Sequence, residues 1–210
     1  MKPRTVRFRS LLALLLLSAS VPGLAAAVNK AGVRTTARAA VPRLPASAYL
    51  GSVGFSPQTY NNCGPASVSA VLSAYGLQVS QQTIASAIKP GSGYMTSEVI
   101  APFLAQYGLQ AVRYKQGTLN HIRALLASGI PVIMLQWLNT PGRIPHFRVA
   151  RGYDDRAGVM WFSDPYYGAN TYVSYTDFER LWGTLYQREF IPVVPQGRTD
   201  LIVRALTRAL

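Results

Sequence analysis

The pattern of apolar and polar positions divides the chain into an earlier part with helical periodicity and a later part with strand periodicity. In "GPASVSAVLSAYG", Val68, Val71, Leu72 and Tyr75 recur at helical spacing and Gly76 follows them, which predicts a helix that begins at or just after the preceding cysteine. Three later segments, "SQQTIASAI", "TSEVIAPFLAQYG" and "TLNHIRALLASG", carry the same kind of pattern. The sequence therefore predicts four helices in this part of the chain.

The later part consists of short runs rich in β-branched and aromatic residues, separated by Gly, Pro and Asp turns. The runs are "IPVIMLQWL", "HFRVARGYD", "VMWFSDP", "ANTYVSY" and "REFIPVVP", with a short helix predicted at "TDFERLW". Helices followed by a meandering sheet are typical of an α+β domain with an antiparallel sheet. The globular pattern extends over residues 49–195, which is the size of one domain.

The first 27 residues have the three parts of a secretion signal. "MKPRTVRFRS" is basic, "LLALLLLSAS" is apolar and "VPGLAAA" is rich in small residues, so we expect a signal peptide over residues 1–27. Pro22 and Gly23 interrupt the apolar run short of the about 20 residues that span a bilayer, which argues against a membrane anchor. Residues 28–48, rich in Ala, Arg, Thr and Pro, are expected to form a flexible tether or pro-segment. The protein is thus expected outside the cytoplasm: secreted, periplasmic or associated with the cell envelope.

The C-terminal tail, residues 196–210, has an amphipathic pattern. Its apolar residues fall on one stripe, and Arg204 and Arg208 lie off that stripe. Such a segment either lies on anionic lipid or packs on the domain. The stripe consists of Leu201, Ile202, Ala205, Leu206 and Ala209.

The formal net charge of +13 is concentrated at the two ends of the chain. Residues 1–27 and 28–48 each hold four basic residues and no acidic one, whereas residues 49–195 hold ten basic and seven acidic residues. The basic residues form no cluster interleaved with aromatic residues, so nucleic-acid binding is not expected. The basic flanks favour contact with an anionic cell surface or membrane surface instead.

Cys63 is the single cysteine of the chain, so no disulfide can form within it. It is a core residue, an intermolecular link or a free reactive thiol. Its place at a predicted helix start favours the third, because unpaired N–H groups there stabilise a thiolate. The helix dipole contributes at most about 2 kcal/mol, so a strongly lowered thiol pKa also requires a neighbouring imidazolium. We therefore expect an ion-paired thiolate.

Two histidines are available as its partner. His121 falls inside a helical pattern and is interpreted as a solvated helix residue, whereas His146 opens a strand after the Pro-bounded loop "NTPGRIP". If the following hairpin turns at Asp155, His146 lies opposite Asp164; a turn one residue later leaves the two diagonal on the same face. Asp164 would then orient the imidazole, as the third member of a catalytic triad does. The alternative is that "SDP" is simply a turn with Asp before Pro.

An acyl-transfer site also needs donors for the oxyanion. The backbone N–H of Cys63 is one candidate, and the side-chain amide of Gln58, five residues earlier, is the other. Asn61 and Asn62 are also near, but residues of this type commonly satisfy loop backbone groups. No cofactor and no metal are expected, because one cysteine and two distant histidines match no zinc spacing.

These motifs resemble those of the peptidase family-thirty-nine-like (C39-like) papain-fold cysteine peptidases, whose best-known members process double-glycine bacteriocin leaders. The resemblance rests on Gln58 with "NNCGPA", then "PHFRVARGYD", then "FSDPY", and covers about residues 49–195. It implies a papain-like fold with Cys63 as nucleophile, His146 as base, Asp164 as orienting residue and Gln58 as oxyanion donor. Gln58 stands one residue closer to the cysteine than in the wider papain pattern. The sequence holds no ATP-binding or multi-spanning exporter segment, so leader processing during export is not implied.

The sequence thus predicts an exported cysteine peptidase or amidase that cleaves peptide or cell-wall amide bonds through a thioester. Transglutaminase-like transfer of the acyl group to an amine is an alternative, since an amine can replace water in the second step. A catalytically idle peptide-binding module of the same fold is another. Tyr94, Trp137, Tyr166 and Tyr167 are candidates for lining a substrate cleft, with a core position as the alternative for each.

Overall fold

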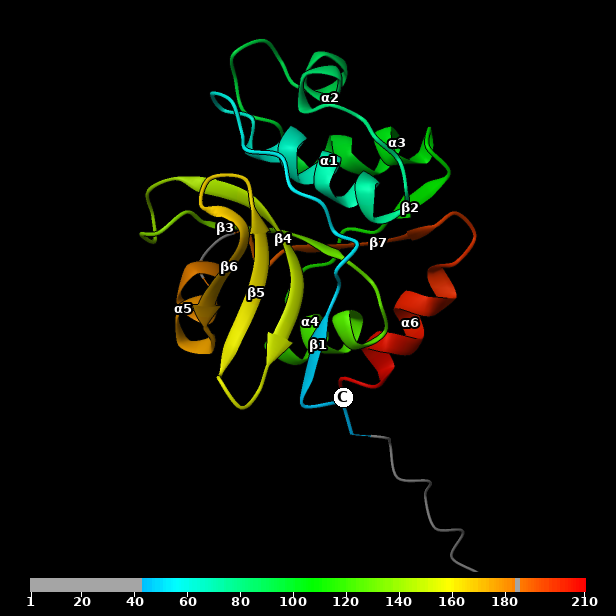
Figure 1. Ribbon diagram of the computed structural model, residues 1–210, viewed down its shortest axis with the longest axis vertical. Helices are drawn as coiled ribbons and strands as arrows, with labels where there is room; N and C mark the ends of the chain where they lie inside the picture. Colours follow the sequence, from blue (N-terminus) through cyan, green and yellow to red (C-terminus); the bar gives the residue numbers. More distant parts are fainter. Residues whose placement is uncertain (1–42, 184–185) are drawn as a thin grey trace, which may run out of the picture. The chain divides into compact units, whose positions relative to one another are not determined.

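The computed structural model describes residues 43–183 and 186–210, all within one compact unit that runs from Ala40 to Leu210 (Figure 1). The predicted signal peptide, residues 1–27, lies outside the described residues, as does most of the predicted tether. None of the helices in the described part of the chain has the length and apolar character that crossing a bilayer requires.

The centre of the fold is an antiparallel sheet of seven strands, as the α+β prediction requires. Its main path runs in the order β2-β7-β3-β4-β5-β6, and β1 pairs with the far end of β4. The central strand β4 is long enough to pair with β3 over its first half and with β1 over its last residues. The strands are β1 (Ser47–Tyr49), β2 (Leu109–Ala111), β3 (Val132–Trp137), β4 (Pro145–Asp154), β5 (Val159–Asp164), β6 (Gly168–Ser174) and β7 (Phe190–Pro195).

The helices begin and end close to the residues that their capping signals indicate. Ser80 accepts a hydrogen bond from the N–H of Thr83 and caps α2, and Thr118 caps α4 through the N–H of His121. Gly76, with a φ of 76°, ends the turn after α1, where a residue without a side chain is favoured. The helices are α1 (Cys63–Ala74), α2 (Gln81–Ile88), α3 (Ile100–Ala105), α4 (Leu119–Ala127), α5 (Tyr175–Trp182) and α6 (Thr199–Thr207).

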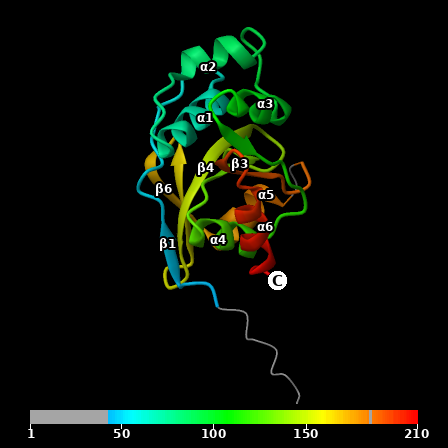
Figure 2. The ribbon, with the colours of Figure 1, turned by 90° about the vertical axis from the view of Figure 1, so that its right-hand side faces the viewer.

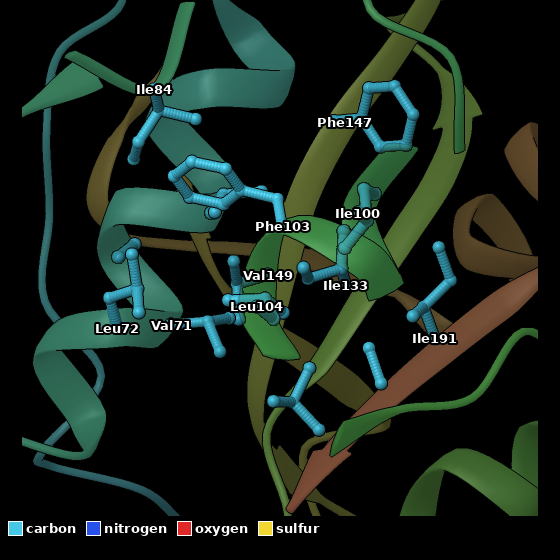
Figure 3. Close-up of a cluster of buried hydrophobic side chains, with 14 of the residues drawn as sticks. Val71, Leu72, Ile84, Ile100, Phe103, Leu104, Ile133, Phe147, Val149 and Ile191 are labelled. Carbon is cyan, nitrogen blue, oxygen red and sulfur yellow. The ribbon is translucent and has the colours of Figure 1, made fainter. Parts of the chain in front are cut away.

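The sheet separates two hydrophobic cores. Helices α1, α2 and α3 cover one face, and α4, α5 and α6 pack against the other, as Figures 1 and 2 show from two directions. Strand β4 contributes to both cores because its side chains alternate: Phe147 and Val149 face α1, whereas Ala150 faces the second core. Figure 3 shows the first core, in which Val71 and Leu72 of α1 meet residues of α3 and the sheet. This packing holds α1 firmly against β4.

The C-terminal tail belongs to the second core. Ile202 and Ala205 of α6 are buried there, and Leu201 and Leu206 pack against it. Of the two alternatives for residues 196–210, packing on the domain is therefore the one observed, and the apolar stripe is largely covered by protein.

Two short strands depart from the sequence prediction. β1 falls at the end of the segment expected to be a tether, and just before it the hydroxyl of Tyr153 donates to the carbonyl of Pro45 at 2.6 Å. The tether prediction for residues 28–48 is therefore wrong at its C-terminal end. β2 was not predicted either. A strand of three residues shows too little alternation to be recognised from the sequence.

The third predicted helix is shorter than its pattern. The segment begins as a 3-10 turn, Ser97–Val99, before α3 (Ile100–Ala105). Pro102 explains the change, because it has no N–H to donate to the carbonyl of Glu98 four residues earlier.

Candidate active site

Cys63 is the first residue of α1, as its sequence context predicts. The two preceding asparagines hold the loop, and no side chain caps the first turn of the helix. Asn61 has a φ of 56°, which asparagine tolerates, and its amide donates to the carbonyl of Ser92 at 3.0 Å. Asn62 donates to the hydroxyl of Thr59 at 2.7 Å. The loop therefore fixes Cys63 while leaving N–H groups at the start of α1 uncapped by side chains.

Gly64 allows a close approach beside the thiol. A Cβ at this position would lie 2.5 Å from Cε of Met95. The absence of a side chain at Gly64 thus lets Met95 pack beside the start of α1.

His146 and Asp164 meet across the β4–β5 hairpin. His146 lies at the start of β4, Asp164 ends β5, and Nε2 of His146 is 2.9 Å from Oδ1 of Asp164. Val149 pairs with Ser163 in this hairpin. Continuing that register places His146 diagonal to Asp164, so the later of the two turn positions considered for the hairpin is the one observed.

Asp164 also organises the turn that follows it. The same Oδ1 accepts the N–H groups of Tyr166 at 2.9 Å and Tyr167 at 3.1 Å. One carboxylate oxygen therefore both holds the turn that "SDP" predicts and contacts the imidazole of His146.

Arg148 completes this cluster and was not identified from the sequence. Its side chain is 2% exposed, and its NH1 lies 3.3 Å from Oδ2 of Asp164. NH2 donates to the carbonyls of Trp137 at 3.2 Å and Leu138 at 2.9 Å, and the guanidinium lies over the ring of Phe162. The continued register places Arg148 directly opposite Asp164. A strand residue two positions after His146 shares its face, and that is the signal that could have revealed it.

The charges of the cluster set its protonation. Burial acts to raise the pKa of Asp164, but the hydrogen bond with His146 and the charge of Arg148 hold that pKa below its ordinary value. Asp164 is therefore an ionised carboxylate that only accepts hydrogen bonds. Nε2 of His146 must then carry the hydrogen, which leaves Nδ1 of the neutral ring as a base.

The expected ion-paired thiolate is not what the structure favours. Burial raises the pKa of the Cys63 thiol, although the backbone N–H groups of Phe147, Gly64 and Cys63 act in the opposite direction. Burial also lowers the pKa of His146, and the opposing effect of Asp164 is smaller. Both groups are 8% exposed or less, so removal from water outweighs the helix start and favours a neutral thiol beside a neutral imidazole.

Cys63, His146 and Gln58 line one open cleft with a volume of about 560 Å³. The backbone N–H of Gln58 donates to the carbonyl of Pro165 at 2.9 Å, which ties this residue to the turn after Asp164. Its Oε1 is buried and accepts no hydrogen bond from the described residues. The structure thus brings together the three residues whose chemistry the sequence had grouped, with Asp164 behind His146.

The four aromatic candidates divide between the cleft and other positions. Tyr94 and Tyr166 line the cleft and are exposed, and the ring of Tyr166 meets His146 edge to face. Tyr167 lines a separate depression with Arg148. Trp137 packs against the first core.

His121 has a different place from His146. Its Nδ1 accepts the N–H of Thr118 at 3.2 Å, and its ring stacks on Phe190. It is a half-buried capping residue of α4 rather than a solvated one, and it does not line the cleft that contains Cys63.

This arrangement has the parts of an acyl-transfer site: a thiol, a base in the same cleft and a carboxylate that fixes the base. Within residues 43–183 and 186–210, no three His, Cys, Asp or Glu side chains are grouped so that they could hold a metal ion. The chemistry that these residues support is nucleophilic attack by sulfur.

Comparisons with known proteins identify the family and similar folds. The model of the Peptidase_C39 like family matches residues 50–189. The crystal structure of the peptidase domain of Streptococcus ComA, a bifunctional ABC transporter involved in quorum sensing, is similar with a TM-score of 0.57 and 18% identity, over 69% of this chain and 99% of that one. A double glycine motif protease from an AMS/PCAT transporter, in complex with the leader peptide, is similar with a TM-score of 0.51 and 19% identity, over 69% and 91% of the two chains. A search of curated proteins finds no match.

Proposed function

This chain belongs to the Peptidase_C39 like family and is a papain-like cysteine peptidase, and we propose that Cys63, His146 and Asp164 are its catalytic triad. The observation that carries the proposal is the 2.9 Å contact between Nε2 of His146 and Oδ1 of Asp164, beside a cleft that contains Cys63. It leaves Nδ1 of the imidazole as the base for the thiol.

In the first half of the reaction, Nδ1 of His146 takes the proton of the Cys63 thiol as Sγ attacks the carbonyl carbon of the substrate. The C–N bond then breaks, and the imidazolium returns the proton to the leaving amine. A thioester between Cys63 and the acyl part of the substrate remains.

In the second half, water attacks the thioester carbonyl while Nδ1 of His146 takes a proton from it. The C–S bond breaks, the acid leaves, and the imidazolium returns its proton to the sulfur. Asp164 stays ionised throughout and stabilises the imidazolium in each half.

The oxyanion of each tetrahedral intermediate would be held by the backbone N–H of Cys63 and the side-chain amide of Gln58. The position of Gln58 supports this role: the residue lines the cleft together with Cys63, and its buried Oε1 accepts no hydrogen bond from the described residues. Loss of one such donor commonly costs about 100- to 1,000-fold in kcat.

We further propose that the protein acts outside the cytoplasm on peptide substrates. Export is supported by the order of basic, apolar and small residues in 1–27. A peptide substrate is supported by the similar double glycine motif protease, whose structure contains a leader peptide. We include cell-wall peptides among the proposed substrates. We also propose that the basic flanks contact an anionic cell surface or membrane surface. A mature N-terminus after Ala25 to Ala27 is expected from sequencing, and recovery of Met1 from a cytoplasmic fraction would contradict export.

Peptide hydrolysis is tested by incubating the purified protein with a mixed peptide library and identifying new termini by mass spectrometry. We expect Cys63→Ala and His146→Ala to abolish cleavage, whereas His121→Ala, the matched histidine control, retains it. The same digest with an added primary amine distinguishes water from amine as acceptor, because acyl transfer leaves an adduct mass on the new C-terminus. Cleavage that persists in Cys63→Ala would rule out the proposed nucleophile.

A further inference from the structure

A second depression adjoins the catalytic cleft. It has a volume of about 400 Å³, shares Cys63 and Tyr94 with the cleft, and has apolar walls formed by Met95, Leu135 and Phe147. Because Cys63 lines both the cleft and this depression, a side chain of a bound substrate close to the scissile bond would enter it. Its walls suit an aliphatic stem.

The same depression contains a buried carboxylate with an unused acceptor. The side chain of Glu189 is 3% exposed, and its Oε1 accepts no hydrogen bond from any residue in 43–183 or 186–210. Its Oε2 lies 3.6 Å from Nε of Arg113, beyond hydrogen-bond distance. A buried carboxylate oxygen without a donor is unfavourable, so a ligand that supplies a donor here is favoured.

Arg113 does not neutralise Glu189 by itself. Its NH1 pairs with Glu98, a second carboxylate that lines the depression, so one guanidinium faces two acidic groups. Arg143 also lines the depression but is exposed, where water and salt screen its charge. The buried side of the depression thus has an acidic group that one further cation would balance.

We propose that this depression is a specificity subsite for a basic side chain, lysine or arginine, near the scissile bond of the peptide substrate. The methylene stem lies along Met95, Leu135 and Phe147, and the cationic end pairs with the carboxylate of Glu189, which lines the depression. This inference rests on the proposed peptidase function, since it assigns the substrate class of the same site.

The test compares peptides that differ only in lysine versus norleucine, which keeps the stem and removes the ammonium group, scanned on both sides of the scissile bond. At one position, the wild-type protein is expected to have a kcat/KM at least about tenfold higher for lysine, in line with a hydrogen bond to a charged group. Glu189→Gln should abolish this difference, measured as the ratio of kcat/KM for the two peptides within the variant.

Glu98→Gln tests the charge balance separately, because Arg113 would then face Glu189 alone. It should lower the preference for lysine without abolishing it. Glu189→Asp should keep part of it, which separates loss of the carboxylate from loss of packing. No preference in the wild-type protein, or one that survives Glu189→Gln, overturns the subsite and leaves the peptidase proposal standing.

Binding decides the subsite independently of hydrolysis. Fluorescence anisotropy of the same peptide pair on the Cys63→Ala full-length chain should show tighter binding of the lysine peptide, lost when Glu189→Gln is added. If the wild-type protein cleaves no peptide, the proposed function fails, while this measurement still supports or overturns the basic-side-chain subsite.

Discussion

NH1 of Arg148 lies 3.3 Å from Oδ2 of Asp164, and both side chains are buried in the hairpin that carries His146. The other oxygen of Asp164 contacts His146. We therefore expect Arg148 to position the proposed base through the carboxylate, and its charge also contributes to lowering the pKa of His146.

Replacing Arg148 should change the pH dependence of catalysis. Because the pKa of His146 is lowered, first by burial and also by Arg148, the base stays neutral below its ordinary pKa of about 6.5. In Arg148→Met the pKa of His146 should rise, so the acidic limb of kcat/KM, measured between pH 4 and 8, should move to higher pH.

The control for this change is Arg148→Lys, which keeps a cation beside Asp164 and should keep the limb near its wild-type position. Arg148→Met also leaves a buried carboxylate without its cation, so the free energy of unfolding should fall by about 3–5 kcal/mol. A lower stability with an unchanged acidic limb would show that Arg148 has a structural role only.

The thiol of the free enzyme is expected to alkylate slowly at neutral and acidic pH. Burial raises the pKa of Cys63, so the rate with iodoacetamide should increase only above the ordinary thiol pKa of about 8.5. The rate is measured by mass spectrometry of the Cys63 peptide between pH 5 and 10. Rapid alkylation at pH 6 that is lost in His146→Ala would instead establish the ion-paired thiolate that the helix-start argument favoured.

Gly64 is expected to tolerate a methyl group only at a cost. In Gly64→Ala the new Cβ meets the end of Met95, which must move away from the start of α1. We expect a loss of about 1–3 kcal/mol in the free energy of unfolding, measured with urea, together with a lower kcat/KM because Met95 lines the same depression as Cys63. Gly51→Ala, where a Cβ would meet nothing within 4 Å, is the control and should change stability by less than about 0.5 kcal/mol.

The residues found from the sequence each stand beside a strong local signal. Cys63 stands at a helix start, His146 follows a Pro-bounded loop, and Asp164 ends a strand in a short hairpin. Such signals depend only on neighbouring residues in the sequence, so they can be recognised without knowledge of the tertiary structure. The diagonal placement of His146 and Asp164 was one of two alternatives, because the exact turn position could not be read from the pattern.

What the sequence did not reveal depends on burial. Arg148 and Glu189 are charged residues of a kind that usually lies at the surface. Each is buried only because segments distant in the sequence pack around it. The sequence argument lowers the pKa of Cys63 whereas burial raises it, because the helix start is a local feature but desolvation is set by the whole fold. The bulge between Ala150 and Gly152, which shifts the register of β4 and β5, likewise leaves no clear local pattern.

The C-terminal helix is expected to contribute to stability rather than to lipid binding. Ile202 is fully buried in the second core, whereas its neighbour Val203 is 57% exposed. Ile202→Ala should lower the free energy of unfolding by about 2–5 kcal/mol, and Val203→Ala should change it by less than about 0.5 kcal/mol.

Vesicles of anionic lipid should sediment the full chain and a chain ending at Pro195 equally, because the apolar stripe is covered by protein. Binding that requires residues 196–210 while Ile202→Ala leaves stability unchanged would mean that α6 leaves the domain for the membrane.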